Sequence, residues 1–173
     1  MRCLLKVLLV ASILGSASAQ AENPELVTRG HVNLSLAGAQ AVVAAAHAQA
    51  ESMKLKVNIA VVDDGGHLLA FARMDGARPA SSYTAITKAT AAATTRVPTG
   101  PLPPGKPVNP QLSLAVESAA HASGGKFTSL FGGVPIEVDG EVIGAVGVGG
   151  ATGEQDAEIA RAGIAALVKA LSK

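Results

Sequence analysis

The first regular pattern along the chain is an apolar stripe of helical period. Apolar side chains recur every three or four positions after Ser35, so they share one face of a helix. Ser35 is a good N-cap, because its hydroxyl accepts a hydrogen bond from the first turn. We therefore predict a helix that starts at Ser35 and runs to about Met53. Its expected buried stripe is Leu36, Ala39, Val43, Ala46 and Ala50.

The pattern then changes to one typical of strands. Residues 57–62 and 67–74 are short apolar runs, and the first is rich in β-branched side chains. An Asp-Asp-Gly-Gly sequence separates them and favours a tight turn, so the two runs are predicted to form a hairpin. A second helix is expected from Ser81 or Ser82 to about Thr95.

A proline-rich stretch divides the chain near its middle. Residues 96–110 hold six of the nine prolines, a density that excludes a helix or a central strand. We interpret this stretch as a loop, and loops of this length in small domains are often functional or disordered. A short alanine-rich helix is expected after it, over residues 112–122.

The last part of the chain repeats the order of hairpin and helix. Residues 134–138 and 141–148 are predicted strands joined by an Asp-Gly turn, and Thr152 with Gln155 forms a capping box that starts the last helix. Such short connections require antiparallel pairing. We predict an α/β (α+β) domain whose central antiparallel sheet is built from two hairpins and flanked by helices. The expected buried stripe of the last helix is Ile159, Gly163, Ala166, Leu167 and Ala170.

Residues 1–19 have the organisation of a secretory signal peptide. Arg2 and Lys6 supply positive charge, an apolar stretch covers 7–14, and Ala-Ser-Ala at 17–19 matches a cleavage site. The apolar stretch is shorter than the roughly 20 residues that span a bilayer, so a membrane anchor is the less favoured alternative. We expect a periplasmic or secreted protein with no stable membrane insertion after cleavage.

The mature chain, residues 20–173, is expected to form a single domain after a weakly ordered lead-in over 20–29. Cleavage removes 19 of the 173 residues and takes away Cys3, the only cysteine, which excludes disulfides and thiolate metal sites. The formal net charge changes from +1 to −1 with the loss of Arg2 and Lys6, and so small a charge gives no support for nucleic-acid binding. Large side chains are scarce, so we expect a homo-oligomer.

Glycines cluster at the end of the last predicted strand. Glycine within a strand often marks the close approach of a ligand or of another backbone. Gly147, Gly149 and Gly150 lead into the capped helix, whose first N–H groups can hold a carboxylate or a phosphate. The alternative is that these glycines only let a helix pack tightly on the sheet. The dinucleotide fingerprint does not apply, because the neighbouring units are hairpins.

Charged residues cluster around the exit of the first hairpin, namely Arg73, Asp75, Arg78 and Lys88. Arginine can bind a carboxylate in a bidentate manner, so this cluster suggests a small organic acid as ligand, with Asp75 or His67 for proton transfer. A turn pair between Arg73 and Asp75, with the other charges solvated, is the simpler explanation. No Gly-x-Ser-x-Gly motif or Ser/His/Asp order indicates nucleophilic catalysis.

The four histidines do not have the spacing of a zinc site. A haem needs only one axial side chain, however, so a lone histidine is sufficient. His47 and His121 are flanked by small residues, beside which a flat ligand can lie. For each of them an exposed or hydrogen-bonded histidine is the simpler explanation.

Several short motifs follow one another along the predicted domain. They are VVDDGGHL at 61–68, RMDGA at 73–77, Ser82, Lys88-Ala89, FGGVPI at 131–136, Asp139-Gly140, VIGAVGVGG at 142–150 and Glu154-Gln155-Asp156. In this order they resemble the GlcG/HbpS-like family of haem-binding or haem-degrading domains. The resemblance covers about residues 34–171 and implies a profilin-like domain that assembles as a homo-oligomer. Secreted members of this family bind haem, and a related domain ends the PduO-type cobalamin adenosyltransferase.

The sequence departs from the family pattern directly after Lys88-Ala89. Members often carry an aromatic residue and a threonine there, and the resemblance implies a threonine of this region as a haem ligand. Here Thr90 is displaced by one position, which rotates it by about 100° on a helix. Thr94, Thr95 and Thr99 are nearby substitutes.

We therefore predict an exported protein that binds haem or a similar tetrapyrrole, in haem or iron sensing or handling. A small organic-acid binding protein or enzyme is the alternative, and an assembly partner without a small ligand is a third. The only metal expected is haem iron. The candidate ligand-binding residues are Arg73, Asp75, Lys88, Thr95, Thr99, His47, His121, Gly147, Gly149 and Gly150.

Overall fold

The computed structural model describes residues 30–100 and 106–172. Residues 1–31 and 32–173 are separate units, and the fold given below is that of the second unit. The predicted signal peptide over 1–19 and the lead-in over 20–29 lie outside the described residues, as does part of the proline-rich loop.

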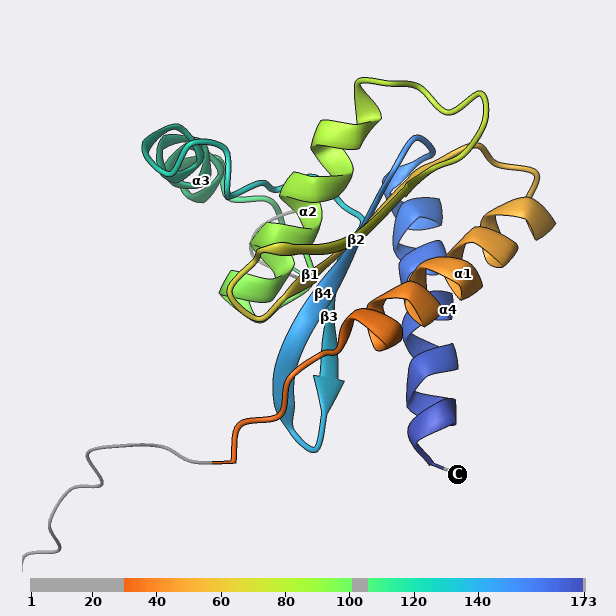
Figure 1. Ribbon diagram of the computed structural model, residues 1–173. Helices are drawn as coiled ribbons and strands as arrows, with labels where there is room; N and C mark the ends of the chain where they lie inside the picture. Colours follow the sequence, from red (N-terminus) through yellow and green to blue (C-terminus); the bar gives the residue numbers. More distant parts are fainter. Residues whose placement is uncertain (1–29, 101–105, 173) are drawn as a thin grey trace, which may run out of the picture. The chain divides into compact units, whose positions relative to one another are not determined.

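A four-stranded antiparallel sheet lies at the centre of the domain (Figure 1). The strand order is β2-β1-β4-β3, so the two hairpins join through β1 and β4, which pair antiparallel with Asn58 opposite Gly149. This sheet of two hairpins confirms the predicted α+β fold class. The strands are β1 (Asn58–Asp63), β2 (Leu68–Arg73), β3 (Gly133–Val138) and β4 (Glu141–Gly149).

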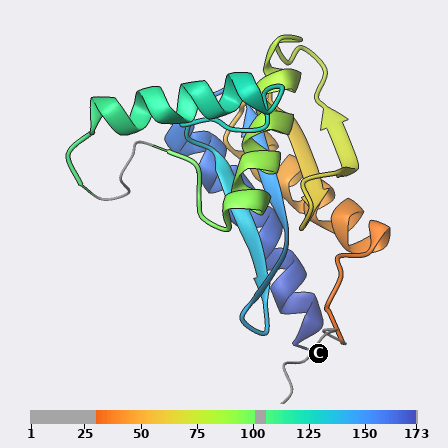
Figure 2. The same ribbon diagram turned by 90° about the vertical axis from the view of Figure 1, so that its left-hand side faces the viewer.

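Helices cover both faces of the sheet. Helices α1 and α4 lie side by side on one face, and α2 covers the other (Figure 1). Helix α3 lies further out on the α2 side, and none of its residues is buried (Figure 2). All eight predicted elements are present, with ends within two residues of the predicted ones where an end was predicted. The helices are α1 (Leu36–Ser52), α2 (Ser81–Thr95), α3 (Pro110–Ala122) and α4 (Gly153–Leu171).

The predicted caps form. The Ser35 hydroxyl accepts a hydrogen bond from the Gly38 N–H at 3.1 Å. At the start of α4, the Thr152 hydroxyl accepts from the Gln155 N–H while the Gln155 side chain accepts from the Thr152 N–H. All three bonds satisfy N–H groups that the first helical turn cannot pair internally, which explains why the helices begin at these residues.

The sheet separates two hydrophobic cores. Ile59 and Val61 point toward α1 and α4, whereas Ala60 and Val62 pack against the alanines of α2. This alternation follows the two-residue period of a strand. On the α2 side the side chains are small, so the helix backbone approaches the sheet closely.

Two of the strand glycines are required by this close approach. A Cβ atom at Gly147 would overlap the carbonyl oxygen of Ala85 in α2. At Gly149 it would lie 2.7 Å from the carbonyl oxygen of Ser81 and 2.6 Å from the Thr84 hydroxyl. Helix packing therefore accounts for these two glycines without a ligand.

The buried helix faces differ in detail from the predicted stripes. In α1, Val42 is buried, whereas Leu36 is 55% exposed and Val43 is half-buried. The reason is that α1 carries two adjacent apolar stripes. The stripe with Val42 faces the core directly, whereas in the other stripe Val43 packs only partly against the core and Leu36 is exposed. In α4, Ala166 and Ala170 are exposed, because the stripe facing the core runs from Ile159 through Gly163 to Leu167 and then ends.

Candidate functional site

Two charged side chains meet in the interior, one from each face of the sheet. The Lys88 Nζ of α2 lies 2.8 Å from the Asp156 Oδ2 of α4 and also donates to the Val148 carbonyl oxygen at 2.9 Å. The second carboxylate oxygen of Asp156 accepts the Ala151 backbone N–H at 3.1 Å. The Lys88 and Asp156 side chains are only 6% and 2% exposed, so this ion pair is almost fully removed from water.

The segment before β3 makes room for the ion pair. A Cβ atom at Gly132 would lie 2.7 Å from the Asp156 Cβ and 3.0 Å from the Lys88 Nζ. Gly132 also has a φ of +118°, a conformation that side chains rarely adopt. The capping box of α4 fixes Asp156 in the first helical turn. A glycine and a helix cap together therefore position the pair.

The ion pair forms part of the lining of a surface cleft of about 380 Å³. Arg78 lines it from the segment before α2, Thr84 from the first turn of α2, and Glu154 from the start of α4. Leu130 and Phe131, from the segment before β3, add apolar surface. The cleft thus combines a charged pair, an arginine and an apolar wall.

Burial raises the pKa of Asp156 above its usual value of 3.8. The hydrogen bond and the charge of Lys88, the Ala151 N–H and the charge of Arg78 all act in the opposite direction, but they offset only part of the loss of water. A short ion pair alone would lower this pKa, so desolvation is the larger effect here. Carboxyl groups with a raised pKa in a cleft are frequent at functional sites.

Only two of the four charged residues that cluster near the first hairpin in the sequence line the cleft. Lys88 and Arg78 line the cleft, whereas Arg73 and Asp75 are exposed and are not among its lining residues. The Arg78 Nε donates to the Ser81 hydroxyl at 2.9 Å, which anchors its side chain at the start of α2. Gly150 also lines the cleft, with a φ of +137°.

The candidate threonines hold local structure together. The Thr99 hydroxyl accepts the Gly133 N–H at 2.8 Å, and this side chain is buried. Thr95 donates to the Ala91 carbonyl oxygen at 2.6 Å within α2. Thr90, at the displaced family position, donates to the Gly66 carbonyl oxygen at 3.1 Å. None of the three lines the cleft.

His47 faces a groove of about 430 Å³ between α1 and β2. The groove is lined mainly by apolar side chains, among them Leu36, Val43 and Phe71. Leu36 and Val43 belong to the second apolar stripe of α1, which explains why Leu36 is exposed and Val43 is only partly buried against the core. The His47 Nδ1 lies 3.7 Å from a carboxylate oxygen of Glu51, one turn further along the helix.

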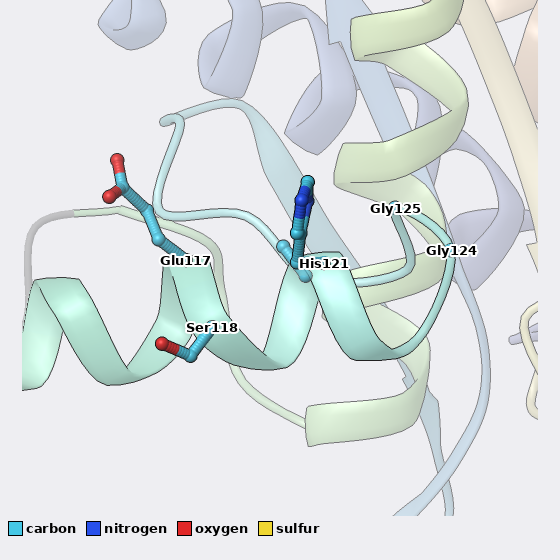
Figure 3. Close-up of a pocket in the computed structure, with 6 residues that line it drawn as sticks. Glu117, Ser118, His121, Gly124 and Gly125 are labelled. Carbon is cyan, nitrogen blue, oxygen red and sulfur yellow. The ribbon is translucent and has the colours of Figure 1, made fainter.

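His121 lies in a different environment near the end of α3 (Figure 3). Its pocket of about 640 Å³ is lined by Glu117, Ser118, Ala120, Gly124 and Gly125, so no large apolar side chain is among its lining residues. His121 and His47 thus belong to separate pockets.

The contacts of His67 belong to the hairpin turn between β1 and β2. Its Nδ1 lies 3.4 Å from Asp63 Oδ1, the oxygen that also accepts the His67 backbone N–H at 2.8 Å in the hairpin turn.

A clustered metal site and a membrane-spanning helix are both absent from the part of the chain that the structure describes. Within residues 30–100 and 106–172, no three His, Cys, Asp or Glu side chains are grouped so as to hold a metal ion. In the same part of the chain, no helix has the length and apolar character needed to cross a bilayer.

The sequence contains a signal for the buried position of Asp156. As an acid in the first turn of α4, Asp156 suits the helix dipole whether it is buried or exposed, so this feature alone does not indicate a site. Asp156 also lies three residues before Ile159 and seven before Gly163, so it falls on the predicted buried face of α4. A carboxylate on a buried stripe needs a partner, and Lys88 occupies the buried stripe of α2.

Residues 34–165 match the family model described as "Haem degrading protein HbpS-like". The chain belongs to the HbpS-like family. Protein GlcG of Escherichia coli (strain K12) is 44% identical over 117 residues, which cover 68% of this chain and 81% of GlcG.

Solved structures have the same fold. The crystal structure of Klebsiella pneumoniae protein ORFY superposes with a TM-score of 0.70 and 28% identity, covering 83% of this chain and 97% of ORFY. The crystal structure of a PduOC:haem complex gives a TM-score of 0.64 and 27% identity over 78% of this chain and 95% of PduOC. The predicted family and fold are therefore confirmed, and PduOC is a similar protein that binds haem.

Proposed function

We propose that this HbpS-like chain is an exported haem-binding protein and that His47 is its iron ligand. The observation that carries the proposal is the imidazole of His47 beside an apolar groove, in a chain whose fold resembles that of PduOC. A porphyrin needs an apolar surface for its ring and one axial donor for its iron. Bound haem would supply a redox-active iron at this groove.

The residues around His47 fit this role better than those around the other candidates. Leu36, Val43 and Phe71 provide apolar contact for a flat ring. A carboxylate near one imidazole nitrogen favours the other nitrogen as metal ligand, and Glu51 lies near Nδ1. The pocket of His121 has no large apolar side chain to contact a ring, and the hydroxyls of Thr95 and Thr99 already hydrogen-bond to the backbone.

We further propose that a second copy of the chain covers the groove. Leu36 and Phe71 are exposed, so one face of a ring bound beside His47 would meet water in a single copy. β2 is an edge strand of the sheet and borders the same groove, so its outer backbone groups are available for pairing. A homo-oligomer is the simplest way to bury both the exposed apolar groove and the edge of β2.

Titration with hemin tests the proposed ligand. The mature protein should give a saturable Soret shift, and His47→Ala should weaken binding by about tenfold or more or change the spectrum of the bound iron, because the axial bond is lost. His121→Ala is the matched control and should bind like the unmodified protein. Equal spectra and affinities for His47→Ala and the unmodified protein would exclude His47 as the ligand.

Export is tested separately, on the full chain expressed with its leader. Intact mass measurement of protein from the periplasm or the medium should give a chain that begins at Gln20, as expected for cleavage after Ala19. Recovery of the full 173-residue chain from the cytoplasm alone would contradict export.

A further inference from the structure

We infer that the cleft beside Lys88 and Asp156 binds a small organic acid, with the ligand carboxylate on Arg78 and its short apolar part against Leu130 and Phe131. This site is separate from the proposed haem groove. The cleft is formed by α2, α4 and the segment before β3, whereas the groove is formed by α1 and β2. The inference therefore does not depend on haem binding.

The charges in the cleft favour an anion. Lys88 and Asp156 neutralise each other within hydrogen-bond distance. Glu154 is exposed to solvent at the start of α4, where water and the positive end of the helix dipole screen its charge. None of the ion pairs among the described residues includes Arg78. Arg78 is then the cation in the cleft whose charge no carboxylate neutralises by direct contact.

Arg78 is held in a way that suits carboxylate binding. Its Nε donates to the hydroxyl of Ser81, a buried residue, which fixes one edge of the guanidinium. The two terminal nitrogens carry the remaining donors, and the residue itself is exposed. A guanidinium that is already ordered loses less entropy when it binds a carboxylate.

Lys88 can add a second contact from the interior side of the cleft. An ammonium group has three N–H donors, and the bonds to Val148 and Asp156 use two of them. Because Lys88 lines the cleft, the third can reach a ligand oxygen there. The ion pair thus offers a donor in a setting where water is largely excluded.

The apolar wall of Leu130 and Phe131 determines what part of the ligand can lie beyond its carboxylate. Phe131 is packed against the backbone of α4, since a Cβ atom at Gly153 would overlap the Phe131 side chain. Leu130 next to it is 52% exposed. A cleft of about 380 Å³ with one fixed ring and one exposed leucine suits an acid with a chain of a few carbon atoms.

Calorimetric titration of the purified mature protein with butyrate tests the inference. Butyrate should bind saturably, whereas butyramide, its neutral analogue, should not. Arg78→Gln should weaken butyrate binding by about tenfold or more, because a charge-assisted bidentate contact is lost. Arg73→Gln is the matched control, an exposed arginine outside the cleft, and should bind butyrate like the unmodified protein.

A second variant tests the apolar wall independently of the arginine. Leu130→Asn should weaken butyrate binding more than acetate binding, because only butyrate reaches the apolar wall. The absence of saturable butyrate binding, equal binding of butyramide, or an equal loss in Arg73→Gln and Arg78→Gln would each overturn the inference. A hemin titration of Arg78→Gln distinguishes this inference from the haem proposal, because this variant should bind hemin like the unmodified protein.

Discussion

Removing one partner of the Lys88–Asp156 ion pair should destabilise the protein strongly, whereas removing both charges should cost little. In Asp156→Asn, the amide oxygen can still accept the Ala151 N–H, so the change removes mainly the negative charge. The Lys88 ammonium is then left 94% buried without a counter-charge. Breaking a buried pair in this way typically costs about 3–5 kcal/mol, and we expect a loss of that size.

The two remaining variants complete a double-mutant cycle. Lys88→Met preserves most of the side-chain volume, and Asp156 can respond by taking up a proton because its pKa is already raised. The single lysine variant should therefore lose less stability than Asp156→Asn at mildly acidic pH. The double variant has no buried charge and should lie within about 1–2 kcal/mol of the unmodified protein, because apolar replacements of buried pairs are often neutral.

Urea unfolding at pH 7 and at a mildly acidic pH, followed by far-UV circular dichroism, measures all four proteins. Circular dichroism is the suitable signal because the chain has no tryptophan and a single tyrosine. Lys169→Met, at an exposed position of α4, is the control and should change stability by less than about 0.5 kcal/mol. If the losses of the two single variants add up in the double variant, the buried pair is not coupled and this reasoning is refuted.

Three further predictions concern the same framework. Gly147→Ala should cost more than about 2 kcal/mol, because its Cβ would overlap the α2 backbone, whereas Gly140→Ala, which has open space but a φ of +80°, should cost about 1 kcal/mol in the same urea assay. Thr152→Ala should cost about 1 kcal/mol through loss of the α4 cap, and a serine at this position should restore it. Because the pKa of Asp156 is raised, its folded form binds a proton more readily than the unfolded form. The stability difference between the unmodified protein and the double variant should therefore fall as pH rises above 3.8 and level off beyond the folded pKa, and a rise over this range would contradict the assigned direction.

Local signals explain why the elements were predictable. The Ser35 cap, the capping box at Thr152 and the two hairpin turns each depend on residues only a few positions apart. The change from helical to strand period marks the boundary between α1 and β1. Such features are set by neighbouring residues, so the sequence alone was sufficient for them.

The pairing of β1 with β4 could not be predicted in the same way. It joins Asn58 to Gly149, far apart in the chain, and no local pattern specifies which strands of two hairpins meet. This pairing nevertheless creates the site. It places α2 over Gly147 and Gly149, and it brings Lys88 within reach of the first turn of α4.

The sequence also left two explanations of the glycines open, and close packing accounts for all three. Gly147 and Gly149 lie under α2. Gly150 lines the cleft, but it has a φ of +137°, and a Cβ atom there would lie 2.8 Å from the Lys56 carbonyl oxygen. The sequence could not show these close approaches, because they depend on which backbone segments meet in the folded domain, a tertiary property.

A buried ion pair is weak evidence for stability, because an apolar pair of the same volume often serves equally well. If the Lys88→Met, Asp156→Asn double variant is as stable as predicted, stability alone does not account for the charges in this position. The same variant can then be titrated with butyrate. A stable double variant that binds butyrate about tenfold more weakly would show that the pair serves the cleft, through the third N–H of Lys88. A stable variant that binds butyrate normally would restrict the site to Arg78 and the apolar wall of Leu130 and Phe131.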